Sequence, residues 1–166
     1  MACPEGLRPP ALGNSLKSMT PQIVKRWLPD SSLTERPLSI FDLQWYGGDL
    51  RLITSIHYSK EAGEPGDDSA VLVFNGVTAF QVFDEYWGPQ EVLESSAAQL
   101  AEPYPYGGRW PFLELDGSRW ITALVARERT RDVSELRHLV VTSQNMDLHV
   151  AIHSAAIPMY YAPKQR

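Results

Sequence analysis

Apolar and polar residues alternate over short runs of this chain, and turn-forming residues separate the runs. Alternation with a period of two is typical of β-strands, because successive side chains on a strand point to opposite faces of the sheet. Turn signals recur from residue 37 onward without alternating strand and helix patterns. That arrangement favours antiparallel hairpins. The pattern therefore predicts an α+β protein, mostly β, with about eight strands in an antiparallel, hairpin-rich sheet or sandwich and two short helices.

The stretch 69–87 contains two apolar runs that flank Asn75 and Gly76. Asn-Gly is the strongest short-range signal for a hairpin, because a type I′ turn needs positive φ at both central residues. A two-residue loop there would set Phe74 opposite Val77. Both faces of the resulting ribbon are largely apolar, so we expect this hairpin at the centre of a sheet that is covered on both sides.

A hairpin is also predicted just before this one, with a two-residue Gly-Gly loop at 47–48. That loop would set Trp45 opposite Leu50 and Phe41 opposite Thr54. One face of the ribbon would then be apolar and the other polar. A slip of one residue would mix the two faces, so the pattern predicts a well-specified register.

Two further hairpins are predicted in the second half of the chain. An Asp-Gly turn at 116–117 would set Glu114 opposite Arg119 as a cross-strand ion pair. A loop near 145–146 would set Val141 opposite Val150 and give the last hairpin one clean apolar face.

The two helices are expected at 20–28 and 91–101. In the first, Thr20 is a suitable N-cap and Pro21 suits the first helical position. Its apolar residues fall on one face, and we expect Trp27 to dock that face on the sheet. The second helix is expected to end before Pro103.

Length and composition predict a flexible arm over 1–19, rich in Pro, Gly and Ser, followed by one globular domain over 20–166. The net charge of −5 argues against a general nucleic-acid or anionic-membrane binder. Cys3 is the single cysteine, so neither an intrachain disulfide nor a cysteine-based metal site is expected. Without a recognisable signal peptide or membrane span, we expect a cytoplasmic protein.

The last hairpin turns three histidines to its polar face. The predicted register sets His138 opposite His153, with His149 on the same side. His149 and His153 would lie about 13 Å apart along the strand, too far to hold one metal ion. We therefore expect no metal site and a half-exposed polar face. The alternative is a small hydrolase or metal-dependent enzyme that uses these histidines.

Other catalytic patterns are missing. Asp84 and Glu85 are adjacent, so on a strand they would point to opposite faces and could not act together. The sequence contains no Gly-x-Ser-x-Gly turn, no phosphate-binding Gly-rich loop with Lys and no dinucleotide fingerprint. We therefore predict no catalytic residue and no cofactor.

An aromatic loop over 103–111 is the strongest candidate for a binding surface. It carries Tyr and Trp residues around a single arginine, and these three residue types dominate interface hot spots. The loop could also stack a small ligand, or be clamped onto its own sheet. The predicted binding residues are Tyr104, Tyr106, Arg109 and Trp110, joined by Tyr86 and Trp87.

Three stretches resemble a layout found in small bacterial domains: IFDLQWYGGDLRLITSIHY, VLVFNGVTAF and RHLVVTSQNMDLHVAI. The resemblance spans roughly Leu38 to Ser154, and it is to immunity-protein-like families of toxin systems and their uncharacterised relatives. The histidine usual before the opening Asp in that layout is replaced here by Phe41, which precedes Asp42. The resemblance implies a binding protein without catalysis, whose partner is another protein.

These observations favour a non-enzymatic protein-binding module, in the immunity-like case one that neutralises a cognate toxin. The partner is then another protein or a second copy of the chain, not a nucleic acid or a membrane. An oligomerising structural domain remains a further alternative to the enzyme.

Overall fold

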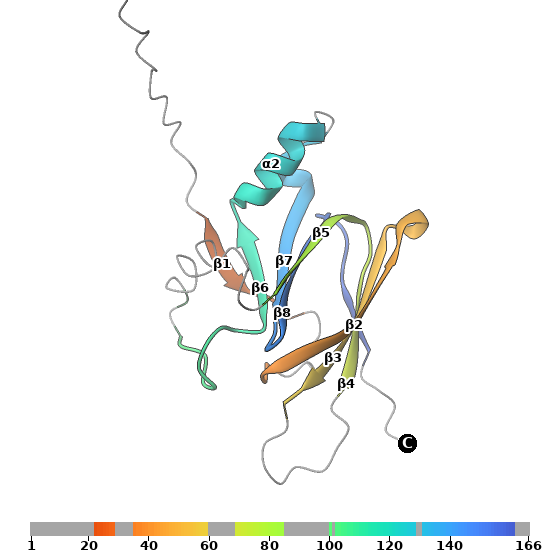
Figure 1. The fold of residues 1–166 in the computed structure, drawn as a ribbon. Helices are drawn as coiled ribbons and strands as arrows, with labels where there is room; N and C mark the ends of the chain where they lie inside the picture. The colour runs from red at the N-terminus through yellow and green to blue at the C-terminus, as the bar shows by residue number, and fades with distance from the viewer. Residues whose placement is uncertain are drawn as a thin grey trace, which may run out of the picture.

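The computed structural model describes residues 22–28, 35–59, 69–84, 100, 102–128 and 131–161. Nine strands in this part of the chain form two antiparallel sheets, which confirms the predicted fold class (Figure 1). In chain order the elements are β1 (Ile23–Arg26), β2 (Leu38–Tyr46), η1 (Gly47–Asp49), β3 (Arg51–Tyr58), β4 (Ser69–Phe74), β5 (Val77–Asp84), β6 (Phe112–Asp116), α2 (Arg119–Glu128), η2 (Val133–Glu135), β7 (Leu136–Thr142), β8 (Met146–His153) and β9 (Met159–Tyr161).

The five-stranded sheet has the order β1-β6-β7-β8-β5, and the four-stranded sheet has the order β2-β3-β4-β9. The main core lies between the two sheets, where aliphatic side chains of both inner faces meet Phe74 and Phe112. Trp27 joins this core, with its ring 6.0 Å from each of those two phenylalanine rings. Burial of this apolar surface is the main stabilising contribution to the sandwich.

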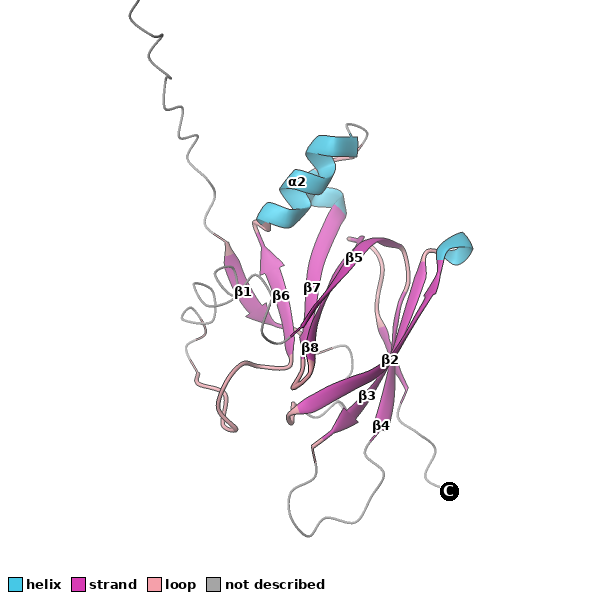
Figure 2. Cartoon of the chain, viewed as in Figure 1, coloured by secondary structure: helices cyan, strands magenta, loops and turns pink. Residues whose placement is uncertain are grey.

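The outer face of the five-stranded sheet is covered by two different segments. At one end, Tyr104 and Trp110 lie on Leu113, Leu115 and Val140. At the other end, α2 lies over the sheet, and its apolar residues cluster with the start of β7 and with β8 (Figure 2). Two small satellite cores therefore supplement the main one.

The predicted helix over 20–28 is wrong, because Ile23–Arg26 form strand β1 at the edge of the five-stranded sheet. A helix of this length is marginal in water, whereas β-branched residues suit a strand that pairs with β6. Val24 is buried in the satellite core under Tyr104 and Trp110, and Trp27 continues the pairing by donating its N–H to the carbonyl of Phe112 (3.1 Å). The expectation that Trp27 docks this segment is confirmed.

The predicted central hairpin at Asn75 and Gly76 is also wrong. β4 belongs to the four-stranded sheet and β5 to the edge of the other, so the chain crosses between sheets at this turn (Figure 1). Gly76 has φ +63°, but Asn75 does not have positive φ, and a type I′ turn would need it at both positions. Gly76 fixes the crossing through its carbonyl, which accepts from the N–H of His153 (3.0 Å).

Gly76→Val is expected to lower the free energy of unfolding by more than about 1 kcal/mol, because an L-residue is disfavoured at positive φ and a β-branched one most of all. An added Cβ would lie 3.5 Å from the Cβ atoms of Ala156 and His153, an ordinary contact, so the effect arises from the backbone. Gly48→Ala is the control, because its Cβ would enter open space. Equal denaturation midpoints for both variants and the wild type would contradict this role of the turn.

The first predicted hairpin is confirmed, but its register is not. β2 and β3 are joined by a four-residue loop in which Leu50 has φ +48°, and Trp45 pairs with Leu52. A β-bulge between Ile40 and Asp42 lets Leu38 and Ile40 face the core, and it leaves Phe41 exposed. The bulge shifts the register by one residue within β2. The alternation of apolar and polar residues had predicted an unbroken register.

The predicted third hairpin is replaced by a strand followed by a helix. After β6 the chain turns at Gly117 (φ +65°) and enters α2 instead of a returning strand. Ser118 caps the helix, since its Oγ accepts from the N–H of Ile121 (3.2 Å). Glu114 therefore does not face Arg119; it accepts two hydrogen bonds from Arg137 on β7 (2.8 and 2.9 Å).

The last hairpin is confirmed with its pairing shifted by two residues, because Val141 pairs with Leu148 and not with Val150. A shift of two preserves the faces, so the predicted apolar face lies in the main core. The turn of this hairpin also joins the two sheets. Asn145 accepts from the N–H of Ile40 (3.0 Å) and donates to its carbonyl (2.6 Å), as a neighbouring strand would.

The predicted arm over 1–19 and nearly all of the predicted helix over 91–101 lie outside the described residues. Tyr86 and Trp87 also lie outside them. In the described part of the chain, no helix is both long and apolar enough to cross a membrane.

Candidate functional site

The aromatic loop, residues 103–111, leads into β6 and crosses the outer face of the five-stranded sheet. Its two largest anchors are buried, because Tyr104 and Trp110 are each 8% exposed. The hydroxyl of Tyr104 donates to the carbonyl of Glu35 (2.8 Å), and Nε1 of Trp110 donates to the carbonyl of Glu102 (3.1 Å). For these two residues the interpretation of a loop clamped onto its own sheet is therefore the correct one.

Burial raises the pKa of the Tyr104 hydroxyl well above its ordinary value, and the neighbouring Tyr106 and Glu35 raise it further. The hydroxyl therefore keeps its proton and stays a donor over the whole physiological range. Arg26 stacks on the outer side of Trp110, with its guanidinium carbon 3.7 Å from the ring centroid, and forms an ion pair with Glu35. The hydrogen bond from Tyr104 to Glu35 and the stacking of Arg26 on Trp110 both hold the aromatic loop in place.

Arg109 is anchored as well. Its Nη1 donates to Oδ2 of Asp147 at 2.8 Å, and Asp147 is 3% exposed. A charge pair that is largely removed from water is sensitive to the loss of one partner, because the remaining charge is left uncompensated. Arg109 therefore fixes the aromatic loop to the start of β8, and its guanidinium is less available to a partner than its sequence position suggests.

Tyr106 differs from the other aromatic residues of the loop. It is 47% exposed, and its ring lies 5.4 Å from that of Tyr104, which supports it from below. Gly107 and Gly108, with φ of +78° and +75°, turn the chain directly after it. The loop thus presents one aromatic side chain to solvent on a fixed base.

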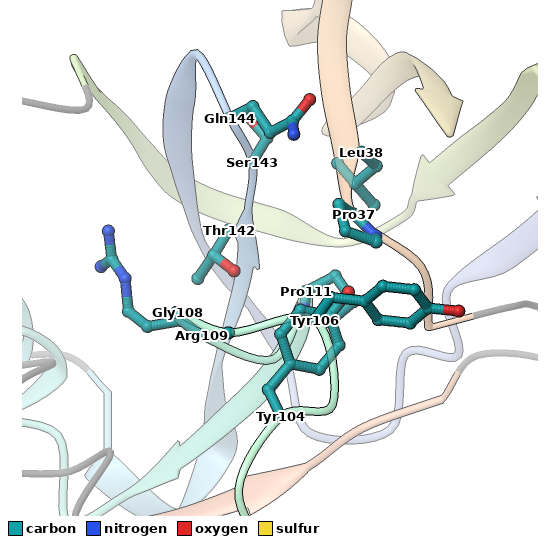
Figure 3. Close-up of a pocket in the computed structure, with 11 residues that line it drawn as sticks. Pro37, Leu38, Tyr104, Tyr106, Gly108, Arg109, Pro111, Thr142, Ser143 and Gln144 are labelled. Carbon is teal, nitrogen blue, oxygen red and sulfur yellow. The ribbon is translucent and has the colours of Figure 1, made fainter. Parts of the chain in front are cut away.

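A pocket of about 300 Å³ lies beside Tyr106, between the aromatic loop, the start of β2 and the turn after β7. Figure 3 shows the Tyr106 ring directed toward Pro37, whereas the Arg109 guanidinium extends to the opposite side. The walls mix apolar rings with hydroxyl and amide groups, a combination suited to holding a side chain of a partner. The lining residues are Pro37, Leu38, Tyr104, Tyr106, Gly107, Gly108, Arg109, Pro111, Thr142, Ser143 and Gln144.

The histidines are arranged differently from the prediction. His138 pairs with Ala151, and its Nε2 lies 2.9 Å from Nδ1 of His149, its diagonal neighbour on β8. Both are 2% exposed, so the face is buried and not half-exposed, while His153 is exposed and apart from them. The predicted pairing of His138 with His153 is therefore wrong.

Burial lowers the pKa of His138 to about 3, with the nearby His149 lowering it further. Burial also lowers the pKa of His149 to about 4, assisted by the positive charge of Arg109. Both imidazoles are therefore neutral at pH 7. Within the residues that the structure describes, no three His, Cys, Asp or Glu side chains form a group that could hold a metal ion.

Sequence reasoning missed the third member of this cluster. Oγ of Ser118 lies 2.7 Å from Nδ1 of His138, and Trp120 on α2 covers the same imidazole at 4.8 Å between ring centroids. The available signal was Ser118 three residues before Ile121, at the start of an apolar pattern with helical spacing. The Asp-Gly turn signal obscured it.

The structure thus brings together Tyr104, Tyr106, Arg109 and Trp110 in one loop, and the buried histidines form a second cluster on β7 and β8. The loop has a solvent-exposed residue and a pocket, whereas the histidines lie beneath α2. Comparison with protein-family models, with curated proteins and with solved structures gives no match to this chain.

Proposed function

We propose that this chain is a protein-binding module that needs no catalysis for its task, and that its binding surface is centred on Tyr106. The observation that carries the proposal is the pocket of about 300 Å³ beside this exposed tyrosine. Tyrosine is enriched among residues that dominate binding energy, especially where neighbouring contacts exclude water. Around Tyr106, Pro37 and Gln144 supply such neighbours.

The anchoring of the aromatic loop supports the proposal. A loop that must order itself on binding loses conformational entropy, and this loss weakens affinity. Here Tyr104 and Trp110 are buried, and Arg109 is tied to Asp147. The loop is therefore ordered before a partner arrives, and most of the interaction energy of Tyr106 becomes available for binding.

The resemblance to immunity-protein-like domains leads us to propose a toxin as the partner, neutralised in the cytoplasm by occlusion. A net charge of −5 suits association with a basic protein, because opposite charges accelerate encounter. In such systems the toxin and its immunity protein are encoded side by side, so the first partner to test is the product of the neighbouring gene.

The test is growth of a bacterial host that expresses the neighbouring gene product together with this chain. We expect the neighbour alone to arrest growth and the wild-type chain to restore it. Tyr106→Ala should lose the rescue, because it removes the exposed ring and leaves the side chains of the buried anchors in place. The matched control is Tyr161→Ala on β9, a tyrosine of similar exposure (52%) in the other sheet.

Rescue by Tyr106→Ala at the wild-type level would contradict the proposed surface. A neighbouring product without any effect on growth would contradict the immunity-like role.

A further inference from the structure

A serine, two histidines and a pocket lie together at the junction of β6 and α2, away from Tyr106. The strand ends at Asp116, Gly117 turns the chain with positive φ, and Ser118 stands at the helix entrance. A sharp strand-to-helix turn of this kind fixes a serine hydroxyl at the positive end of the helix dipole. The Oγ of Ser118 is held there by the N–H of Ile121.

The hydroxyl is also the first member of a hydrogen-bonded chain. Oγ lies 2.7 Å from Nδ1 of His138, and Nε2 of His138 lies 2.9 Å from Nδ1 of His149. Since Oγ already accepts from Ile121, its own proton is free to be donated to Nδ1. His138 then carries its proton on Nε2 and donates it to His149. This is the order nucleophile, base and orienting group.

The far end of the chain is not satisfied. Nε2 of His149 is buried and has no hydrogen-bond partner among the described residues. An unsatisfied buried polar atom is destabilising, and in a native fold it calls for an explanation. Phe83 and Trp120 enclose that ring, so its Nε2 is kept away from solvent.

A pocket of about 240 Å³ reaches these groups. Ser118 and His138 line it together with four apolar side chains and with charged and polar ones; the apolar residues are Leu115, Ile121, Val133 and Leu136, and the others are Glu114, Asp116, Ser134 and Arg137. The apolar part of this lining suits a short apolar group, and the charged part can face the polar end of a substrate. The volume matches an acyl group of a few carbons.

We propose that Ser118 is the nucleophile of a second, independent activity, the hydrolysis of small esters with short apolar acyl groups. In this activity His138 is the general base, and His149 is a positioning residue that orients it. The inference does not rest on the protein-binding role. An experiment that contradicts one of the two proposals leaves the other unaffected.

The reaction has two balanced stages. Oγ of Ser118 attacks the carbonyl carbon, its proton passes to Nδ1 of His138, and the carbon–oxygen bond to the alcohol breaks as that alcohol takes the proton. Water then attacks the acyl-serine by the same route, releases the carboxylic acid and restores the serine. α2 begins directly after Ser118, so the positive end of its dipole is available to stabilise the negative charge that develops on the carbonyl oxygen.

The burial of His138 sets the expected rate. Its imidazole is neutral at pH 7 and can accept a proton, but a base with so low a pKa is weak. We therefore expect slow turnover, and we choose a reactive probe that reports the first stage alone.

The experiment treats the full chain with a small alkyl fluorophosphonate and follows the adduct by intact mass and peptide mapping. We expect a single adduct on Ser118. Ser134→Ala is the matched control, because Ser134 lines the same pocket but donates to Asp132, and it should label as the wild type does. Ser118→Ala should not label, and His138→Gln should label at least about 100-fold more slowly.

Peptide mapping of the wild type keeps the test decisive if a variant fails to fold. The labelling rate of the wild type should stay level between pH 8 and pH 5, because His138 remains neutral there. A surface serine that reacts through hydroxide would instead slow about tenfold per pH unit. No adduct, an adduct on another residue, or that hydroxide-like pH profile would overturn the proposal.

Discussion

Lowering the pH from 7 to 4.5 is expected to reduce the free energy of unfolding by up to about 5 kcal/mol through His138 and His149. Burial holds their folded pKa values at about 3 and about 4, below the ordinary value of 6.5. Between the folded pKa values and pH 6.5, the two histidines are therefore protonated in the unfolded chain and neutral in the folded chain. Stability is complete above pH 6.5 and is lost as the pH falls toward the folded values.

The magnitude follows from the linkage of protons to folding. Each histidine withholds one proton over about two pH units between 6.5 and 4.5, and the two together account for the loss of about 5 kcal/mol. Urea denaturation at a series of pH values measures this slope. His149→Asn, which keeps a polar atom near the position of Nδ1, should show about half of it.

The control for the pH series is His153→Asn, since His153 is exposed and apart from the pair. It should leave the slope unchanged. A slope that vanishes in His153→Asn but persists in His149→Asn would show that the buried pair is not the source of the acid sensitivity.

Trp110→Ala is expected to destabilise the protein by about 3–5 kcal/mol, the usual range for removing a buried tryptophan. The indole fills the satellite core with Leu113, Leu115 and Val140, and its N–H satisfies the carbonyl of Glu102. Its loss would also remove the ring on which Arg26 stacks. Loss of binding in this variant would therefore report unfolding of the loop, not a missing contact.

The comparison for Trp110→Ala is Tyr106→Ala in the same loop. Tyr106 is half exposed and serves as no anchor, so its removal should change stability by no more than about 0.5 kcal/mol. Chemical denaturation of both variants measures the difference. If the two variants lost equal stability, the division of the loop into buried anchors and a presented residue would be wrong.

The faces of the last hairpin could be predicted from the sequence, but its register could not. In the last hairpin Val141 and Val150 lie on the predicted face although their partners are shifted by two residues. An alternation with a period of two cannot reveal a shift of two residues, because such a shift leaves every side chain on the same face of the sheet. The loop length that sets the register is not encoded in the alternation.

Dipeptide turn signals were the least reliable part of the prediction. Asn75 and Gly76 do turn the chain, but β4 finds its partners in β3 and β9, and β5 finds its partner in β8. At Gly117 the capping of Ile121 by Ser118 favoured a helix over a returning strand. A local signal reports that the chain bends, whereas tertiary pairing decides which element the chain forms after the bend.

The composition of the sequence was enough to identify the aromatic loop, but it did not show which of its side chains are buried and which is exposed. Tyr104 and Tyr106 are two residues apart and chemically identical, yet one is a buried anchor and the other is exposed. The histidine pair was missed for a related reason. His138 and His149 meet diagonally across two strands, and such a contact depends on a register that the sequence left undetermined.

The central claim, that Tyr106 is the focus of a protein-binding surface, is tested most directly by the dissociation constant for the neighbouring gene product. Isothermal titration calorimetry of the folded wild type, Tyr106→Ala and Tyr161→Ala gives that constant for each. We predict that Tyr106→Ala weakens binding by at least about 30-fold, the equivalent of a 2 kcal/mol hot spot, and that Tyr161→Ala changes it by less than about twofold. Equal constants for Tyr106→Ala and the wild type, or a loss confined to Tyr161→Ala, would contradict the claim.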